Sequence, residues 1–212
     1  RTLVDSADLM LPEGVRSIQL EPGPSGGVGA LQVVSAAGYI PFDRRPGAKE
    51  GHSHGLFSGS ALRSMREHLA SRIGPGNGEQ PRRLLLRRNS AYRALKNEQE
   101  LEERLAPHGF DVVYPERLDF VEQFQLFSGA EMVVGATGAA FANLIFCPPQ
   151  THIVICLSAH REHSFGYWQG MAAAVGNRIS YVLGPVAGAR GAGVHADYRI
   201  DVADVLQAIG VR

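Results

Sequence analysis

What this sequence lacks excludes several chemistries. Its 212 residues include only two cysteines, Cys147 and Cys156, each inside an apolar run. We expect both to be buried free thiols, not a disulfide or a metal pair. Lysine plus arginine and aspartate plus glutamate both number 21, so no overall field favours nucleic acid as a partner. No stretch approaches the roughly 18 apolar residues of a membrane helix, and no signal peptide is visible.

Short catalytic and metal-binding motifs are also missing. The chain has no Walker loop. Of its eight histidines, only His52 and His54 are spaced like metal ligands, and no third ligand accompanies them. We therefore expect no bound metal ion.

Two stretches rich in glycine and proline, residues 21–29 and 74–81, divide the chain. Residues 1–80 are predicted to be a loop-rich α/β segment with a strand at 31–34 and a helix at 60–73. Residues 81–212 are predicted to be a second domain. The first residue is Arg1 and not Met, which leaves open whether a further segment precedes it.

After the second stretch, apolar strands alternate with amphipathic helices. Strands are expected at 84–86, 111–113, 132–134, 153–157 and 179–183, and helices through 101–105, from 119, at 139–146, through 168–175 and at 201–209. Strands that are apolar throughout are covered on both faces, so the pattern predicts an α/β fold with a doubly wound, Rossmann-like parallel sheet. Ligands bind such sheets outside the carboxyl ends of the strands.

The loop after the first of these strands is rich in arginine. It contains Arg87, Arg88 and Arg93, and no acidic residue occurs between Arg82 and Asn97. Guanidinium groups match phosphate oxygens in pairs. We expect these arginines to be exposed at the ligand edge, with Arg93 starting the next helix, and to hold a diphosphate. The alternative is a solvated basic surface.

The loop after the third strand is built from small residues, Gly135 to Ala139. Small residues let a ligand approach the backbone and the N–H groups of the next helix. The alternative is a tight turn that serves packing alone. A dinucleotide fingerprint would need a glycine where Phe141 stands and an acid about 20 residues on, and neither is present. Asn143 in the following helix is either a ligand contact or a packing amide.

The stretch from Arg87 to Pro148 resembles glycosyltransferase family 61. The matches occur in order at Arg87, Arg93, Asn97, Glu98, Gly109, Phe110, Pro115, Glu116, Glu122, Gln123 or Gln125, Phe127, Ala130, Gly135, Gly138, Ala139, Asn143, Phe146 and Pro148. A weaker resemblance continues through residues 198–201. One departure is that Thr137 stands where the family usually has histidine.

The resemblance implies a GT-B-like enzyme in which residues 81–212 bind the donor and residues 1–80 form an incomplete acceptor-side segment. It implies an inverting transfer from a nucleotide sugar, expected to be UDP-linked, to a glycan or polysaccharide such as a bacterial capsule. No Asp-x-Asp triplet occurs, which argues against a metal-dependent GT-A enzyme. A cytoplasmic location is expected, and peripheral association with the inner membrane is left open.

The resemblance also assigns roles. Arg87, Arg88 and Arg93 would hold the donor phosphates. The turn Gly135, Thr137, Gly138 and Ala139, together with Asn143, would contact the donor, and Glu116 and Gln123 are further site candidates. Asp43, His52 and His54 are the candidates for the general base. Two other functions stay open: a non-catalytic nucleotide-sugar-binding module, because of Thr137, and a Rossmann-like oxidoreductase.

Overall fold

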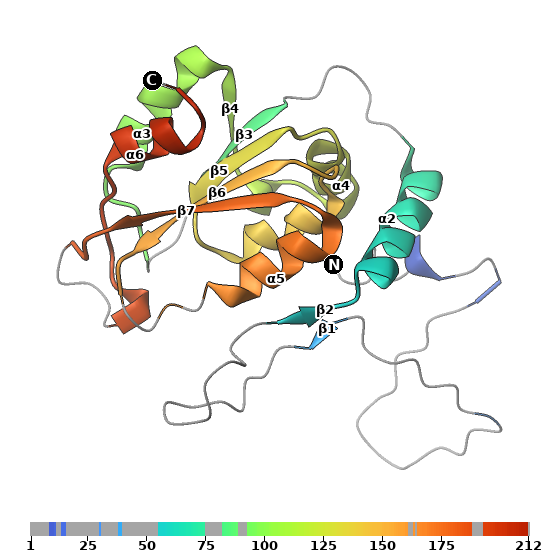
Figure 1. Ribbon diagram of the computed structural model, residues 1–212. Helices are drawn as coiled ribbons and strands as arrows, with labels where there is room; N and C mark the ends of the chain where they lie inside the picture. Colours follow the sequence, from blue (N-terminus) through green and yellow to red (C-terminus); the bar gives the residue numbers. More distant parts are fainter. Residues whose placement is uncertain are drawn as a thin grey trace, which may run out of the picture.

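The computed structural model describes residues 9–11, 14–15, 30, 38–39, 55–74, 82–88, 93–160, 163, 165–187 and 193–211 (Figure 1). The expected strand at 31–34 lies outside these residues. So do the three candidate bases, Asp43, His52 and His54.

A five-stranded parallel sheet forms the centre of the molecule. Its strands are β3 (Arg83–Leu86), β4 (Phe110–Val113), β5 (Met132–Ala136), β6 (His152–Ser158) and β7 (Arg178–Gly184). Their order is β4-β3-β5-β6-β7, and every neighbouring pair is parallel. The predicted Rossmann-like α/β fold is confirmed, and the predicted strands lie within one or two residues of the observed ones.

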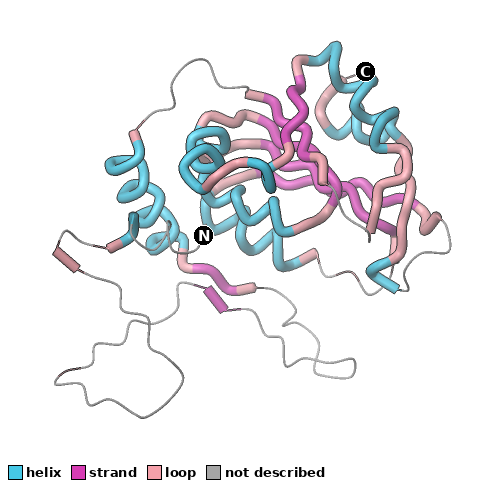
Figure 2. Tube along the Cα trace, turned by 180° about the vertical axis from the view of Figure 1, so that it is seen from behind, coloured by secondary structure: helices cyan, strands magenta, loops and turns pink. Residues whose placement is uncertain are grey.

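Helices cover both faces of this sheet (Figures 1 and 2). One face carries α3 (Glu98–Leu105) and α6 (Val202–Ala208). The other carries α2 (Gly59–Ile73), α4 (Phe120–Ser128), the 3-10 helix η3 (Ala139–Phe146) and α5 (Gly166–Val175). Shorter elements are β1 (Gly38–Tyr39), β2 (Leu56–Phe57), η1 (Ala106–His108), η2 (Pro115–Arg117) and η4 (Gly193–His195).

The alternation of side chains along the strands builds two cores, one on each face. In β3, Leu84 and Leu86 pack with the α2, α4 and α5 side, whereas Leu85 packs with α3 and α6. In β6, Ile155 packs on the α2, α4 and α5 side, and Cys156 packs on the α3 and α6 side. Because successive side chains of a strand point to opposite faces, a run of apolar residues serves both cores.

Helix ends follow the signals in the sequence. Asp119 accepts a hydrogen bond from the Glu122 backbone N–H, and the Glu122 carboxylate accepts one from the Asp119 N–H, both at 2.8 Å. The predicted capping box at the start of α4 is therefore confirmed. Gly176 ends α5 with a φ of 81°, a left-handed conformation that favours glycine. The expected helix at 139–146 is present as a 3-10 helix.

Helix α2 precedes the boundary expected near residue 80 and packs into the same core as the sheet. Leu62 and Leu69 are buried there, and the Arg66 guanidinium donates a hydrogen bond to the Cys147 carbonyl at 2.8 Å. The division into residues 1–80 and 81–212 stays a prediction.

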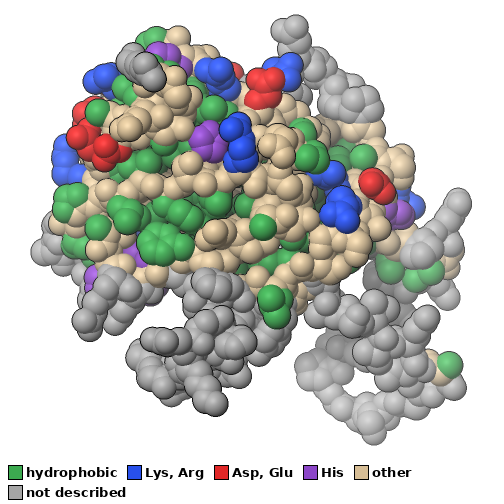
Figure 3. Space-filling view, in the orientation of Figure 1, with side chains coloured by type: hydrophobic (Ala, Val, Ile, Leu, Met, Phe, Trp, Pro, Cys, Tyr) green, Lys and Arg blue, Asp and Glu red, His purple; other side chains and the backbone are tan. Residues whose placement is uncertain are grey.

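The surface differs from one part of the molecule to another. Charged side chains gather over α3 and α6, whereas the face over β7 and α5 is mainly apolar (Figure 3). Leu183 on β7 and Val186 just beyond it are among its exposed apolar residues.

The direction of winding reverses between β3 and β5. From β3 the chain continues to β4 on one side, and it then crosses to β5 on the other side. Open α/β sheets bind ligands in the crevice outside the carboxyl ends of the strands at such a point. Here, Arg87 and Arg88 follow β3, and Thr137 and Gly138 follow β5.

Candidate functional site

Arg88 crosses from the end of β3 to the turn after β5. Its Nη1 donates a hydrogen bond to the Thr137 carbonyl at 2.7 Å. A Cβ on Gly138 would lie 3.0 Å from the same Nη1, so the glycine makes room for the guanidinium. The structure thus brings together two of the predicted site features, the arginine loop and the small-residue turn, at the point where the winding reverses.

The turn after β5 is held by backbone hydrogen bonds. The Thr137 N–H donates to the Cys156 carbonyl at 2.9 Å, and only 7 % of Thr137 is exposed. Gly135 lies within β5 and not in the turn, and a Cβ on it would lie 2.7 Å from the Leu86 carbonyl oxygen. Close packing of β5 on β3 therefore accounts for this glycine. Ala139 starts η3, where the first backbone N–H groups of a helix have no partner within it.

Arg87 points toward α3. Its Nη1 lies 2.6 Å from a carboxylate oxygen of Glu102, and its Nε lies 3.0 Å from one of Glu98. Its side chain is 24 % exposed, so the expectation of an exposed arginine is wrong. The cause is that α3 carries two acids toward the end of β3. Its role toward phosphate stays a prediction.

Arg93 does not start a helix, which corrects the expectation, because α3 begins at Glu98. Arg93 has a φ of 55° and donates its backbone N–H to the His195 carbonyl at 3.2 Å. The burial of Arg88 and then the charge of Arg93 hold the pKa of Arg88 below its ordinary value. The two guanidinium groups therefore act on one another at this edge.

Two buried residues near the carboxyl terminus fix this arrangement, and reasoning from the sequence missed both. The Asp197 carboxylate accepts the Ala94 N–H at 2.9 Å, and Asp197 is only 3 % exposed. The Tyr198 hydroxyl donates to the Cys156 carbonyl at 2.6 Å, directly beside the Thr137 turn. The resemblance at 198–201 was the only signal for Tyr198, and no signal in the sequence pointed to Asp197.

Imidazole groups add to the basic character at the end of β6. The Ser158 hydroxyl lies 2.8 Å from Nε2 of His163, and the ring centres of His160 and His163 are 6.5 Å apart. Burial, followed by the charges of His160, Arg93 and His195, lowers the pKa of His163. Basic side chains therefore gather at the carboxyl end of β6, on the loop of His160 and His163 and on the segments of Arg93 and His195.

The remaining site candidates have different surroundings. Asn143 donates to the side-chain oxygen of Gln123 at 2.8 Å, and the Gln123 amide donates to the Leu118 carbonyl at 3.0 Å. These two side chains join η3 to α4. Glu116 is exposed in η2, and its charge acts on Arg88 to raise the pKa of the guanidinium.

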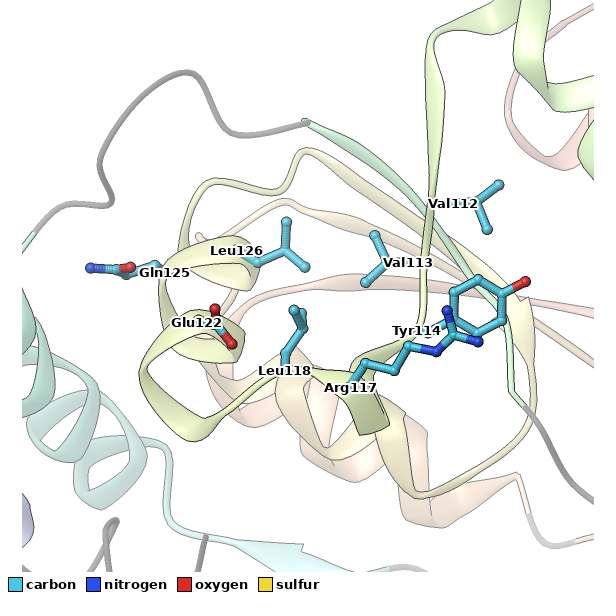
Figure 4. A pocket seen from close by; sticks show the side chains of 8 residues that line it. All are labelled: Val112, Val113, Tyr114, Arg117, Leu118, Glu122, Gln125 and Leu126. Carbon is cyan, nitrogen blue, oxygen red and sulfur yellow. The ribbon is translucent and has the colours of Figure 1, made fainter.

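A cavity of about 460 Å³ lies along the outer side of β4 (Figure 4). It is lined by Val112, Val113, Tyr114, Arg117, Leu118, Glu122, Gln125 and Leu126. The Arg117 guanidinium stacks 4.1 Å from the centre of the Tyr114 ring, and that of Arg87 lies 6.0 Å from it. Tyr114 lines the cavity and faces Arg87, which follows β3, so the cavity borders the end of that strand. It does not lie between β3 and β5.

The described part of the chain lacks both a grouped set of metal ligands and a membrane-crossing helix. Within it, no three histidine, cysteine, aspartate or glutamate side chains are grouped to hold a metal ion. No helix among these residues has the length and apolar character to cross a membrane.

A model of a known protein family matches most of this sequence. The family model described as Glycosyltransferase 61 matches residues 10–154, which is more than half of the chain. The matched range contains the Arg88 loop and the turn after β5 and ends within β6. No curated protein matches the chain.

Proposed function

The chain belongs to glycosyltransferase family 61, and on that premise we propose that its sheet binds the nucleotide-sugar donor of an inverting transfer to a glycan or polysaccharide. The observation that supports this most is the position of Arg88. It lies across the Thr137–Gly138 turn where the winding of the sheet reverses. A parallel sheet favours this place for a ligand, and the guanidinium favours a phosphate.

The chemistry needs fixed positive charge. When the bond between sugar and diphosphate breaks, negative charge grows on the leaving group, and cations already in place stabilise it. Arg88 and Arg93 are the arginines that we assign to this role. Arg87 is held by Glu98 and Glu102, and we assign it to keeping the end of β3 in place. An inverting transfer also needs a base for the acceptor hydroxyl, and Asp43, His52 and His54 stay the candidates.

The nucleoside is assigned to the cavity beside β4. The ends of β4 and β5 are separated by β3, and so by roughly 10 Å at the usual strand spacing, which the ribose of a nucleotide can bridge. The flat pair of Tyr114 and Arg117 is suited to stacking on a base. Tyr114→Ala should weaken binding of a nucleoside diphosphate and leave that of inorganic pyrophosphate unchanged. An equal loss for both ligands would place the nucleoside elsewhere.

Two rivals are separated from this proposal, one by the ligand it would bind and the other by whether the sugar is transferred. An oxidoreductase would need a glycine fingerprint after the first strand of the sheet, but β3 is followed by Arg87 and Arg88. A non-catalytic module would bind the donor without transferring the sugar. Sugar transfer or donor hydrolysis, measured with the donor that binds, distinguishes the enzyme from the module.

The test is a thermal-shift panel of UDP, GDP and CMP, their sugar derivatives, and NAD(P). A ligand at a hundred times its dissociation constant adds about 2.7 kcal/mol to the free energy of unfolding, which gives a clear shift. We expect stabilisation by one nucleotide and its sugars. Stabilisation by NAD(P) alone, or by none of these ligands, would overturn the proposal.

A further inference from the structure

A buried serine holds a histidine at the carboxyl end of β6. Ser158, the last residue of this strand, is 2 % exposed, and its hydroxyl lies 2.8 Å from Nε2 of His163. Strand β6 pairs in register with β5, whose end leads into the Thr137 turn. His163 therefore belongs to the same edge of the sheet as Arg88.

Among the described residues, the charged groups that act on His163 are cationic or can become so. His160 lies on the same loop, Arg93 on the segment before α3, and His195 on η4. Arg93 and His195 are tied together by a backbone hydrogen bond of 3.2 Å. Three segments far apart in the sequence thus direct positive charge toward one imidazole.

The surroundings of His163 disfavour its protonated form, and a bound anion would reduce that effect. Burial is the first cause that lowers the pKa of His163, and the charges of His160, Arg93 and His195 are the next. A bound diphosphate would offset those charges and would favour the protonated imidazole. Binding of an anion and protonation of His163 would therefore each favour the other.

We propose that His163, oriented by Ser158, is a ligand of the donor diphosphate and takes up a proton from solvent when the donor binds. In this proposal the Ser158 hydroxyl donates to Nε2 in the free protein, which leaves the proton of the neutral ring on Nδ1. On binding, Nδ1–H donates to a phosphate oxygen, Nε2 gains the proton, and the Ser158 oxygen becomes the acceptor. This inference rests on the proposed donor site. Ser158 is the positioning residue.

The probe is the nucleotide sugar that binds in the thermal-shift panel. Both of its phosphates are esterified, so it lacks the second phosphate ionisation near pH 6 of a terminal phosphate. Calorimetry in two buffers of different ionisation enthalpy gives the protons taken up. His163→Gln keeps a side chain that can hydrogen-bond and does not titrate. His108→Gln removes a histidine that precedes β4, at the opposite edge of the sheet, and is the matched control.

We expect the wild-type affinity to rise from pH 8 to pH 6 several-fold more than that of His163→Gln, and a rise of one unit in the pKa of His163 sets an upper limit of about tenfold. His163→Gln should lose the matching proton uptake, and His108→Gln should keep it. Ser158→Ala should bind more weakly and still take up the proton. Equal proton uptake in His163→Gln and the wild type would overturn the inference while leaving the donor site intact.

A second measurement does not depend on any variant being folded. The His163 ring is followed by nuclear magnetic resonance in the wild type during a pH titration, with and without the nucleotide sugar. A rise in its pKa on binding supports the inference, and an unchanged or lower pKa overturns it. If no nucleotide sugar binds at all, the proposed function fails together with the inference.

Discussion

At the scale of single residues, the neighbours Arg87 and Arg88 have different partners. Arg88 reaches across the turn after β5, where its guanidinium is only partly buried. A charge-assisted hydrogen bond contributes roughly 1.5 to 3 kcal/mol. Arg88→Ala should therefore weaken nucleotide-sugar binding about ten- to a hundredfold and leave nucleoside binding unchanged, as measured by calorimetry. Arg104→Ala removes an exposed arginine from the last turn of α3 as a control. An equal loss in both variants would contradict a specific role.

Arg87→Ala should act mainly on stability. It leaves the half-buried Glu98 carboxylate without its nearest cation, at a cost of roughly 1 to 3 kcal/mol in the free energy of unfolding. Burial already raises the pKa of Glu98, and Arg87 opposes that rise. Without Arg87 the pKa of Glu98 rises further above its unfolded value.

The sign of the pH dependence follows from this. A carboxylate whose folded pKa is raised gives stability below its unfolded pKa that is lost as the pH rises through the folded pKa. The destabilisation by Arg87→Ala should therefore be larger at pH 8 than at pH 5 in urea denaturation. Arg82→Ala removes an exposed ion pair with Glu131 and should cost at most about 1 kcal/mol. A destabilisation by Arg87→Ala that is smaller at pH 8 would contradict the assignment.

At the scale of elements, the hydrogen bond between Asn143 and Gln123 joins η3 to α4. Both residues were site candidates, and the Asn143 amide donates to the Gln123 oxygen between two elements. Asn143→Ala should lower the free energy of unfolding by about 1 kcal/mol, the usual contribution of such a bond, with nucleotide-sugar affinity unchanged. Leu118 accepts a separate bond from Gln123, so Gln123 stays partly held. If Asn143→Ala weakened nucleotide-sugar binding without lowering stability, Asn143 would instead be a contact of the donor.

Elements were the most predictable part of this fold. The three-leucine strand, the capping box at Asp119 and the helix end at Gly176 are local signals, and each was confirmed. The partners of the arginines were not predictable, because they depend on which face a residue occupies. Arg87 meets Glu98 and Glu102 only because α3 packs on that face. Asp197 acts on a segment more than a hundred residues earlier, and periodicity carries no information about such pairs.

At the scale of the whole molecule, one sheet joins the donor edge to both cores. Cys147 follows η3 and packs in the core on the α5 face, whereas Cys156 lies in β6 and packs in the core on the α6 face. Both thiols are free and fully buried, as the sequence predicted. Burial raises the pKa of Cys156 to about 12 and raises that of Cys147 as well.

These two thiols report on unfolding from opposite faces of the sheet. The thiolate is the reactive form, so both should react with dithionitrobenzoate only when the chain opens. If the sheet and its two cores open as one unit, Cys147 and Cys156 should react at the same rate. A nucleotide sugar at a hundred times its dissociation constant should slow both about a hundredfold, because it adds about 2.7 kcal/mol to the opening free energy. Rapid labelling of either thiol in the native protein, or slowing of Cys156 alone, would show that the two faces open separately.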